Sequence, residues 1–182
     1  MIYSESRLNQ MYKEGFYNYL CSNNFKKVYE HMSNRIMLDN CSSVLDVGCG
    51  DGMFFRVLDS LGYDGRYLGF DLCSSAIEYA KKNYKNNRVN FIQHNWDDEL
   101  GEGEFDAIYF GGIFYYISDK VNFINRYIKK HNPRIILIQD LQQTDFSDVD
   151  KLFDVDTTLF DVDIKINKAR KERQVKILKI KS

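Results

Sequence analysis

The most informative stretch of the chain is Val44-Leu45-Asp46-Val47-Gly48-Cys49-Gly50-Asp51-Gly52. This stretch joins a short apolar run to three glycines at alternate positions and carries two acidic residues. Glycines adopt backbone conformations that are closed to other residues, and they let a ligand approach the main chain closely. The pattern therefore predicts a nucleotide-type binding turn between a strand and a helix.

Phosphate is a poor ligand for this turn. Glycine-rich turns often hold phosphates with backbone N–H groups and a helix N-terminus. Here Asp46 and Asp51 place carboxylates beside the glycines, and the Lys-Ser/Thr pair of a Walker loop is missing. Two carboxylates repel a pyrophosphate but suit a cation, which favours a ligand with a nucleoside end and a cationic amino-acid end. S-adenosylmethionine has both ends.

Further strand signals follow along the chain. Nineteen residues after Gly52, the apolar run at residues 66–71 ends in Asp71. A carboxylate at about this distance binds ribose hydroxyls in nucleotide folds. The remaining signals, in chain order, are a third strand at residues 89–93, the segment His94-Asn95-Trp96-Asp97, and a fourth strand at residues 105–110.

In these motifs and their order, the chain resembles the class I S-adenosylmethionine-dependent methyltransferases of the small-molecule type, over roughly residues 40–181. The resemblance implies a doubly wound α/β fold with a mostly parallel, Rossmann-like sheet of seven strands. It also implies an antiparallel C-terminal hairpin and an N-terminal helical lid. We expect a single methyltransferase domain over residues 1–182, made of a lid segment (residues 1–39) and a catalytic sheet domain (residues 40–182).

Helical signals separate the predicted strands. Helices are expected over residues 52–61, 75–84 and 118–130, and the second opens with a Ser-x-x-Glu capping box formed by Ser75 and Glu78. Because strands alternate with helices, we predict a parallel sheet that is covered on both faces.

The last part of the chain has a different pattern. Residues 134–139 predict a fifth strand that is buried on both faces. Strict alternation over residues 160–166 and a second run at 175–181 predict an antiparallel pair at the sheet edge, because the segment between them is too short for a helical crossover. We expect the basic residues of this hairpin to be solvated.

The lid segment is dense in aromatic residues. A helical stripe packed against the sheet would explain most of its apolar residues, namely Leu20, Phe25, Val28, Met32 and Ile36. In related enzymes such a segment folds over the cofactor and helps to form the acceptor pocket, which suits tyrosines because of their hydroxyl tips. Tyr12 and Tyr17 are therefore candidate substrate residues, together with Tyr115 after the fourth strand.

The resemblance also implies the cofactor contacts. Asp46 orients the loop and helps to hold the ammonium end, and Asp71 accepts hydrogen bonds from the ribose. Trp96 either stacks near the adenine or fills the core. The methionine portion is assigned to Asp46, Gly48, Cys49 and Gly50, the adenine to Leu72, Asn95 and Trp96, and the backbone near the ammonium to Phe110 and Gly111.

Two residues are candidates for a role in catalysis. The sulfonium of the cofactor is already strongly activated, so the reaction chiefly requires placement of the acceptor. Tyr116 stands where many relatives have a histidine; with a pKa of about 10 it is a poor base but a good donor, so we expect it to orient the acceptor. An oxygen acceptor could need a base, and His31 is the candidate, with simple packing as the alternative.

Composition fits an ordinary enzyme domain, with 182 residues, 44% hydrophobic and 28% charged residues, and a net charge of -1. The absence of a long apolar run and of a signal-peptide pattern predicts a cytoplasmic protein that does not enter a membrane. The lone proline, Pro133, precedes Arg134, which excludes the proline motifs of DNA base methyltransferases, and scattered basic residues argue against nucleic-acid binding. The four cysteines are expected to be free thiols, and no metal site is predicted.

These observations favour a small-molecule acceptor that is methylated at oxygen rather than nitrogen. By analogy, the resemblance extends to enzymes that modify sugars, phosphate-linked groups or surface-polysaccharide precursors such as those of capsules. Two alternatives stay open: small-molecule N-methylation, and a non-catalytic S-adenosylmethionine-binding subunit that needs a partner. The sequence does not decide between a monomer and a homodimer.

Overall fold

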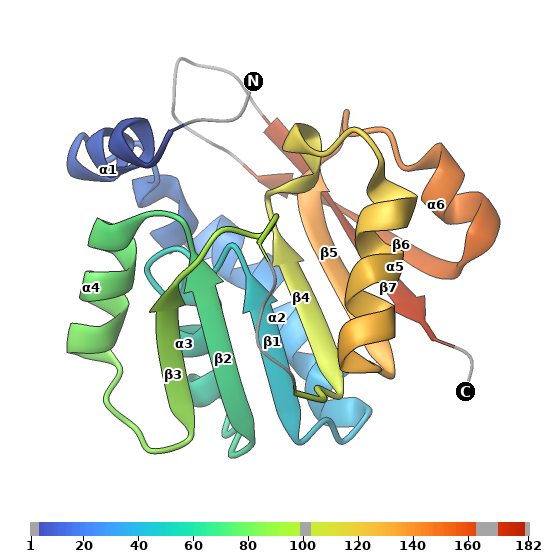
Figure 1. Ribbon diagram of the computed structural model, residues 1–182, viewed down its shortest axis with the longest axis horizontal. Coiled ribbons are helices and arrows are strands. Elements are labelled where there is room, and N and C mark those ends of the chain that lie inside the picture. The colour runs from blue at the N-terminus through green and yellow to red at the C-terminus, as the bar shows by residue number, and fades with distance from the viewer. Residues whose placement is uncertain (1–3, 99–102, 163–170, 181–182) are drawn as a thin grey trace.

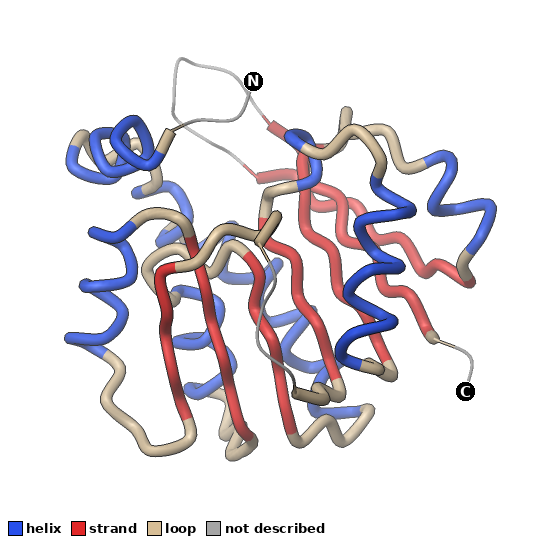
Figure 2. Tube along the Cα trace, viewed as in Figure 1, coloured by secondary structure: helices blue, strands red, loops and turns tan. Residues whose placement is uncertain are grey.

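The computed structural model describes residues 4–98, 103–162 and 171–180. Its centre is a seven-stranded sheet in the order β3-β2-β1-β4-β5-β7-β6 (Figures 1 and 2). β7 is antiparallel to both of its neighbours, whereas the pairs from β3 to β5 are parallel. The expected seven-stranded fold is confirmed. The strands are β1 Ser43–Val47, β2 Arg66–Asp71, β3 Val89–Gln93, β4 Ala107–Gly111, β5 Ile135–Leu141, β6 Asp154–Val162 and β7 Lys171–Lys179.

Helices cover both faces of the sheet. In Figure 1, α5 lies in front of β4 and β5, while α2 and α3 lie behind the sheet. α1 lies beyond the strand ends, next to α4. None of the described helices is long and apolar enough to cross a bilayer. The helices are α1 Glu5–Lys13, α2 Asn23–Leu38, α3 Met53–Ser60, α4 Ser74–Asn83, α5 Lys120–His131 and α6 Ser147–Leu152, with short 3₁₀ turns at η1 Asn18–Cys21 and η2 Phe114–Tyr116.

Alternate residues of each central strand face two separate cores. On β4, Tyr109 joins the core beneath α2 and α3, whereas Ile108 and Phe110 join the core beneath α5. This follows from the two-residue period of a strand. Each fully buried large apolar side chain contributes about 1.5–3 kcal/mol. The predicted helical stripe of the lid segment is confirmed, because four of its side chains are fully buried in the first core: Phe25, Val28, Met32 and Ile36.

The C-terminal hairpin differs from its prediction in extent and burial. Its strands begin at Asp154 and Lys171 rather than at residues 160 and 175, and residues 163–166 lie outside the described residues. β7 lies between β5 and β6, so it is not an edge strand. Lys176 is therefore only 4% exposed, and its Nζ pairs with Asp150 Oδ1 at 2.8 Å, which contradicts the expectation of solvated basic residues.

The predicted capping box of α4 is wrong. The helix begins at Ser74 with Cys73 as its N-cap, one residue before the predicted start, and Cys73 makes no side-chain capping bond. Ser75 instead donates from its hydroxyl to Asn9 Oδ1 of α1, at 2.8 Å. The Ser-x-x-Glu pattern gives a wrong prediction because the side chain of Asn9, 66 residues before Ser75, accepts a hydrogen bond from the backbone N–H of Ser75.

Candidate active site

The glycine loop after β1 leaves its main chain bare. Gly48, Gly50 and Gly52 have φ values of 82°, 55° and 85°, in the left-handed region that glycine adopts without strain. The backbone N–H groups of residues 48 and 49 donate to the carbonyl of Phe70 at 2.9 and 3.0 Å, which fixes the loop to β2. A Cβ on Gly48 would come within 2.7 Å of Ile113 Cγ2. The loop therefore has no room for larger residues at this position.

Asp46 lies fully buried on β1, just before this loop. The hydroxyl of Tyr67 on β2 donates to Asp46 Oδ2, whereas Oδ1 is buried and has no hydrogen-bond partner among the described residues. Burial raises the pKa of Asp46 to about 8, although the hydrogen bond from Tyr67 acts in the opposite direction. A buried carboxyl with an unused oxygen favours a ligand that brings a positive charge or a donor.

Asp71 ends β2, as predicted, and connects the loop to the next helix. Its Oδ2 accepts from the backbone N–H of Gly50 at 2.9 Å, and its Oδ1 accepts from that of Cys73 at 2.8 Å. Burial raises the pKa of this carboxyl, while both backbone hydrogen bonds lower it. Asp71 is thus held in one orientation at the strand tip, where an open sheet of this type binds its ligands.

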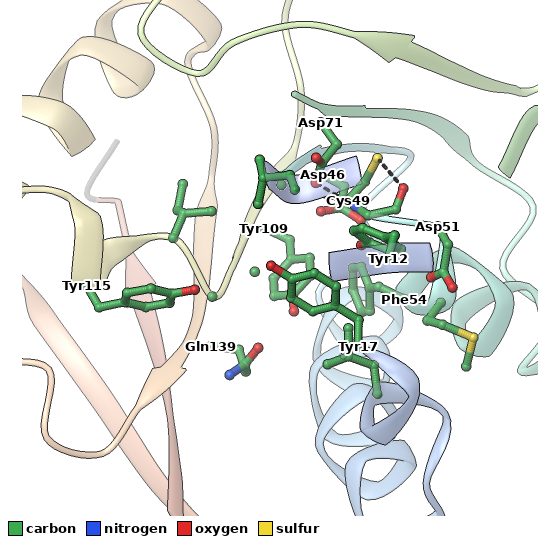
Figure 3. A pocket seen from close by; sticks show the side chains of 18 of the residues that line it. Tyr12, Tyr17, Asp46, Cys49, Asp51, Phe54, Asp71, Tyr109, Tyr115 and Gln139 are labelled. Carbon is green, nitrogen blue, oxygen red and sulfur yellow. Dashed lines mark hydrogen bonds between the residues drawn. The ribbon is translucent and has the colours of Figure 1, made fainter. Parts of the chain in front are cut away.

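A cavity of about 230 Å³ opens beside the two carboxylates (Figure 3). It lies at the carboxyl ends of β1, β4 and β5. Its lining residues Asp46, Tyr109 and Gln139 point to the same face of the sheet, which α2 and α3 cover. Most of the predicted site residues line this cavity: Tyr12, Tyr17, Asp46, Gly48, Cys49, Gly50, Asp71, Trp96, Gly111, Tyr115 and Tyr116.

Three predicted cofactor residues do not line the cavity. Leu72 packs against the small apolar cluster of Leu8, Cys73 and Ala76. Phe110 points its fully buried side chain into the core beneath α5, so only its main chain remains available for the assigned role. Asn95 uses its Oδ1 to accept from the backbone N–H of Asp97 at 3.2 Å, so the oxygen assigned to the adenine closes a local turn.

The structure does not support His31 as a base. The imidazole lies on α2 with its ring centre 5.4 Å from that of Phe160 on β6, in an edge-on arrangement. It does not line the cavity. This position favours the alternative of simple packing, and the role of His31 as a base stays a prediction. The α-helical period that places Val28 and Met32 in the core also directs His31 toward the hairpin.

Aromatic residues form the wall at β4. The backbone N–H of Phe114 donates to the buried Asp140 Oδ2 at 2.8 Å, which fixes the turn η2. The next two residues of this turn form a pair, because the Tyr115 hydroxyl donates to that of Tyr116 at 2.9 Å. Tyr116 also stacks on Trp96, with the ring planes 11° apart and the centres at 6.1 Å. Trp96 fills the core and borders the cavity at the same time.

The lid segment covers the glycine loop. The rings of Tyr12 and Tyr17 lie 4.5 Å apart, and the Tyr12 hydroxyl occupies the space that a Cβ on Gly50 would need. Burial, and then the nearby charge of Asp71, raises the pKa of Tyr12 well above its usual value. α1 is held in place by Asn9, whose Oδ1 accepts from the backbone N–H of residue 75 at 3.0 Å.

Sequence reasoning missed several residues of the site. Tyr67 belongs to an apolar run of the sequence, and its contact with Asp46 depends on the packing between strands. Gln139 is 3% exposed at the end of β5, borders the cavity, and has a side-chain Nε2 without a hydrogen-bond partner among the described residues. A polar residue at the carboxyl end of a buried strand was the available signal. Arg173 of β7 also lines the cavity.

Comparison with known proteins agrees with this geometry. A family model described as "Methyltransferase domain" matches residues 38–177. The malonyl-[acyl-carrier protein] O-methyltransferase of Acetivibrio thermocellus is 25% identical over 111 residues, which cover 58% of this chain and 39% of that protein. The ribosomal protein L11 methyltransferase of Burkholderia mallei is 35% identical over 66 residues, or 36% of this chain and 21% of that protein. The chain thus spans less than half the length of these curated relatives.

Solved structures share the fold. The magnesium protoporphyrin IX methyltransferase of Synechocystis PCC 6803, solved with bound SAM, superposes with a TM-score of 0.71 at 12% identity and with 99% coverage of both chains. At this identity the likeness concerns the fold alone. Since the family match covers most of the chain and includes the glycine loop and all the parallel strands that border the cavity, the chain belongs to the methyltransferase domain family.

Proposed function

We propose that this domain binds S-adenosylmethionine and transfers the methyl group to an oxygen of a small molecule. The observation that carries the proposal is the buried Asp46 Oδ1, which has no partner among the described residues and lies beside a loop of bare main chain. Burying a carboxyl oxygen without a hydrogen-bond partner costs free energy unless a bound ligand supplies that partner. An ammonium group near this carboxyl would compensate it.

The other groups around the loop fit the remaining parts of the cofactor. Asp71 lies one strand away at the tip of β2 and has lone pairs left to accept from ribose hydroxyls. The glycines leave space for the methionine chain to approach the backbone. Trp96 offers an aromatic face on the side of β3, where the adenine would lie.

When bound, the cofactor supplies a methyl group that is already activated by a positively charged sulfur. The residues of the chain then have to align the acceptor and exclude water, which accounts for much of the rate in reactions of this kind. We assign the exclusion of water to Tyr12 and Tyr17 of the lid segment. The hydroxyl pair of Tyr115 and Tyr116 orients the acceptor from the opposite side.

The shape and lining of the cavity favour a small acceptor. The relatives named above differ in what their names say they act on, from an acyl-carrier-linked group to a ribosomal protein. A cavity of about 230 Å³ with polar tips on aromatic walls suits a small molecule. Sugars, phosphate-linked groups and surface-polysaccharide precursors therefore belong in the first panel of acceptors, together with phenols and amines.

Calorimetry with S-adenosylhomocysteine tests cofactor binding. We expect the wild-type protein to bind, and Asp71→Ala to weaken binding about tenfold or more because two hydroxyl contacts are lost. Asp64→Ala, which changes an exposed aspartate at the opposite end of β2, is the matched control and should bind like the wild type. Absence of binding by the wild-type protein, or equal affinity of Asp71→Ala, would refute the proposal.

Turnover separates an enzyme from a binding subunit. The purified protein is incubated with S-adenosylmethionine and each acceptor of the panel, and the release of S-adenosylhomocysteine is measured. Release that depends on the acceptor and needs no second protein would exclude the obligate subunit.

A further inference from the structure

The cavity has an acidic half and a half that presents hydrogen-bond donors. Asp46, Asp51 and Asp71 border it on the side of β1 and β2, whereas Gln139 borders it from the tip of β5 (Figure 3). β4 separates β1 from β5, and neighbouring strands are about 4.8 Å apart, so the two halves lie about 10 Å apart. The carboxylates that would attract a cationic cofactor are therefore distinct from the groups that would contact an acceptor.

Gln139 is the best-defined group of the second half. Its side chain points to the face of α2 and α3, because residues 135 and 137 of the same strand lie in that core. It lies opposite Gly111 in the register of β4 and β5, where the Tyr109 hydroxyl group lies over the glycine, and it borders the cavity beside Tyr109. A buried amide donor without a partner is rare in folded proteins. Nε2 of Gln139 thus indicates a ligand atom that accepts a hydrogen bond.

None of the described residues that line this half can act as a base near neutral pH. Those with polar side chains are Tyr17, Tyr109, Tyr115, Tyr116, Gln139 and Arg173. Tyrosine hydroxyls ionise at about pH 10, an amide does not titrate, and a guanidinium stays protonated. Arg173 adds a positive charge to this side. The half-cavity is therefore suited to stabilise negative charge on an acceptor, but not to remove its proton.

The walls favour a flat molecule. Figure 3 shows the hydroxyl groups of Tyr17 and Tyr115 pointing into the cavity from opposite sides, with Gln139 between them. Tyr116 adds a third ring to these walls, and its plane is held almost parallel to that of Trp96 by stacking. Aromatic rings pack best against planar rings, in offset-stacked or edge-on contact.

Building on the proposed function, we infer that the acceptor is a planar phenol-type compound whose oxygen is already ionised when it binds, and that Nε2 of Gln139 donates to this oxygen. The phenol loses its proton to solvent before transfer. The oxygen then forms the new O–C bond with the methyl group while the C–S bond breaks and its electron pair returns to sulfur. The products are a methyl ether and S-adenosylhomocysteine, and the transfer step needs no base. Gln139 is thereby a specificity-determining residue.

Three probes of similar shape test the charge state: 4-nitrophenol, which ionises near neutral pH, phenol, which ionises like tyrosine at about pH 10, and benzyl alcohol, which does not ionise. The wild-type protein is first shown to bind S-adenosylhomocysteine, so that a failure here is separate from a failure of the proposed function. We expect release of S-adenosylhomocysteine with both phenols and none with benzyl alcohol. The pH profile of kcat/KM should inflect at the pKa of each acceptor.

Several results of this assay would overturn the inference. They are one inflection shared by all acceptors, methylation of benzyl alcohol at the rate of the phenols, and failure to methylate any phenol although the cofactor binds. A shared inflection would instead indicate a base supplied by the protein.

Gln139→Leu tests the donor itself. We expect kcat/KM for the phenols to fall roughly tenfold to a hundredfold, the loss typical of a hydrogen bond to a charged group. Affinity for S-adenosylhomocysteine should stay within about twofold, and the Tm of the ligand-free protein should not fall, because the change removes an unpaired donor. Gln143→Leu, at an exposed position of the following turn, is the control and should behave like the wild type. Unchanged kcat/KM in Gln139→Leu, or a clear loss of Tm, would overturn the inference.

Discussion

Binding of the cofactor should release a proton from Asp46. Burial holds the pKa of this carboxyl at about 8, so about nine-tenths of the molecules carry the proton at pH 7. An ammonium group placed beside the carboxyl favours the ionised form and lowers the pKa. If the pKa falls to about 5 in the complex, nearly every site ionises on binding. The expected release is then roughly 0.9 proton per site at pH 7 and roughly 0.5 at pH 8.

Calorimetry in several buffers measures this number directly. The heat of binding S-adenosylhomocysteine is recorded at pH 7 in buffers with different heats of ionisation, and the slope of one against the other gives the protons released. Asp46→Asn, which cannot ionise, should give a slope near zero. Tyr67→Phe removes the hydrogen bond that lowers the pKa of Asp46, so its release should stay close to one proton even at pH 8.

Two outcomes would refute this reasoning. A heat of binding that is independent of the buffer in the wild-type protein would mean that Asp46 is already ionised, or that no positive charge approaches it. Equal slopes in the wild type and in Asp46→Asn would assign the proton to another group, such as Asp71 or Asp51, whose pKa values burial also raises.

Three further changes test stability. Asp46→Asn should stabilise the ligand-free protein at high pH. Because the pKa of Asp46 is raised in the folded state, its contribution to the free energy of unfolding is present below about pH 4 and is lost as the pH rises to about 8. Urea unfolding of the wild-type protein should show a loss of up to roughly 5 kcal/mol between these limits. Asn9→Ala removes the acceptor for the first donors of α4 and should cost about 1 kcal/mol, with a Tm lower by about 2–4 °C, whereas Asn9→Asp should retain most of the stability. Gly50→Ala should destabilise the protein by pushing against the Tyr12 hydroxyl, and Tyr12→Phe should offset part of the loss; additive costs in this double-mutant cycle would contradict the contact.

The sequence predicted the parallel part of the fold because its signals are local. The glycines at positions 48, 50 and 52 require a main chain that other residues cannot adopt, and each parallel strand is a short apolar run. Asp71 was located from its spacing to the glycine loop, and the structure places it at the cavity. These features depend on residues that are close in sequence, so a single chain contains enough information to find them.

Features that depend on register or on distant partners were not predictable in this way. The predicted hairpin begins too late in the chain because residues 154–159 do not alternate as regularly as residues 160–166, yet they belong to a strand that pairs with the full length of β7. The start of α4 depends on Asn9, which reaches it from another helix. His31 satisfied the chemical requirement for a base, but the direction of its side chain depends on how α2 packs.

Asp46 and Gln139 show how function can be separated from stability in this sheet. Both lie on the face of α2 and α3, at positions where the same strands carry Val44 and Leu137 one period earlier. Each position holds a buried polar atom without a partner among the described residues, at a cost of about 1–3 kcal/mol. Because one atom is an acceptor and the other a donor, and they lie two strands apart, a single small ion cannot satisfy both. Two ligands of opposite character, bound side by side, can.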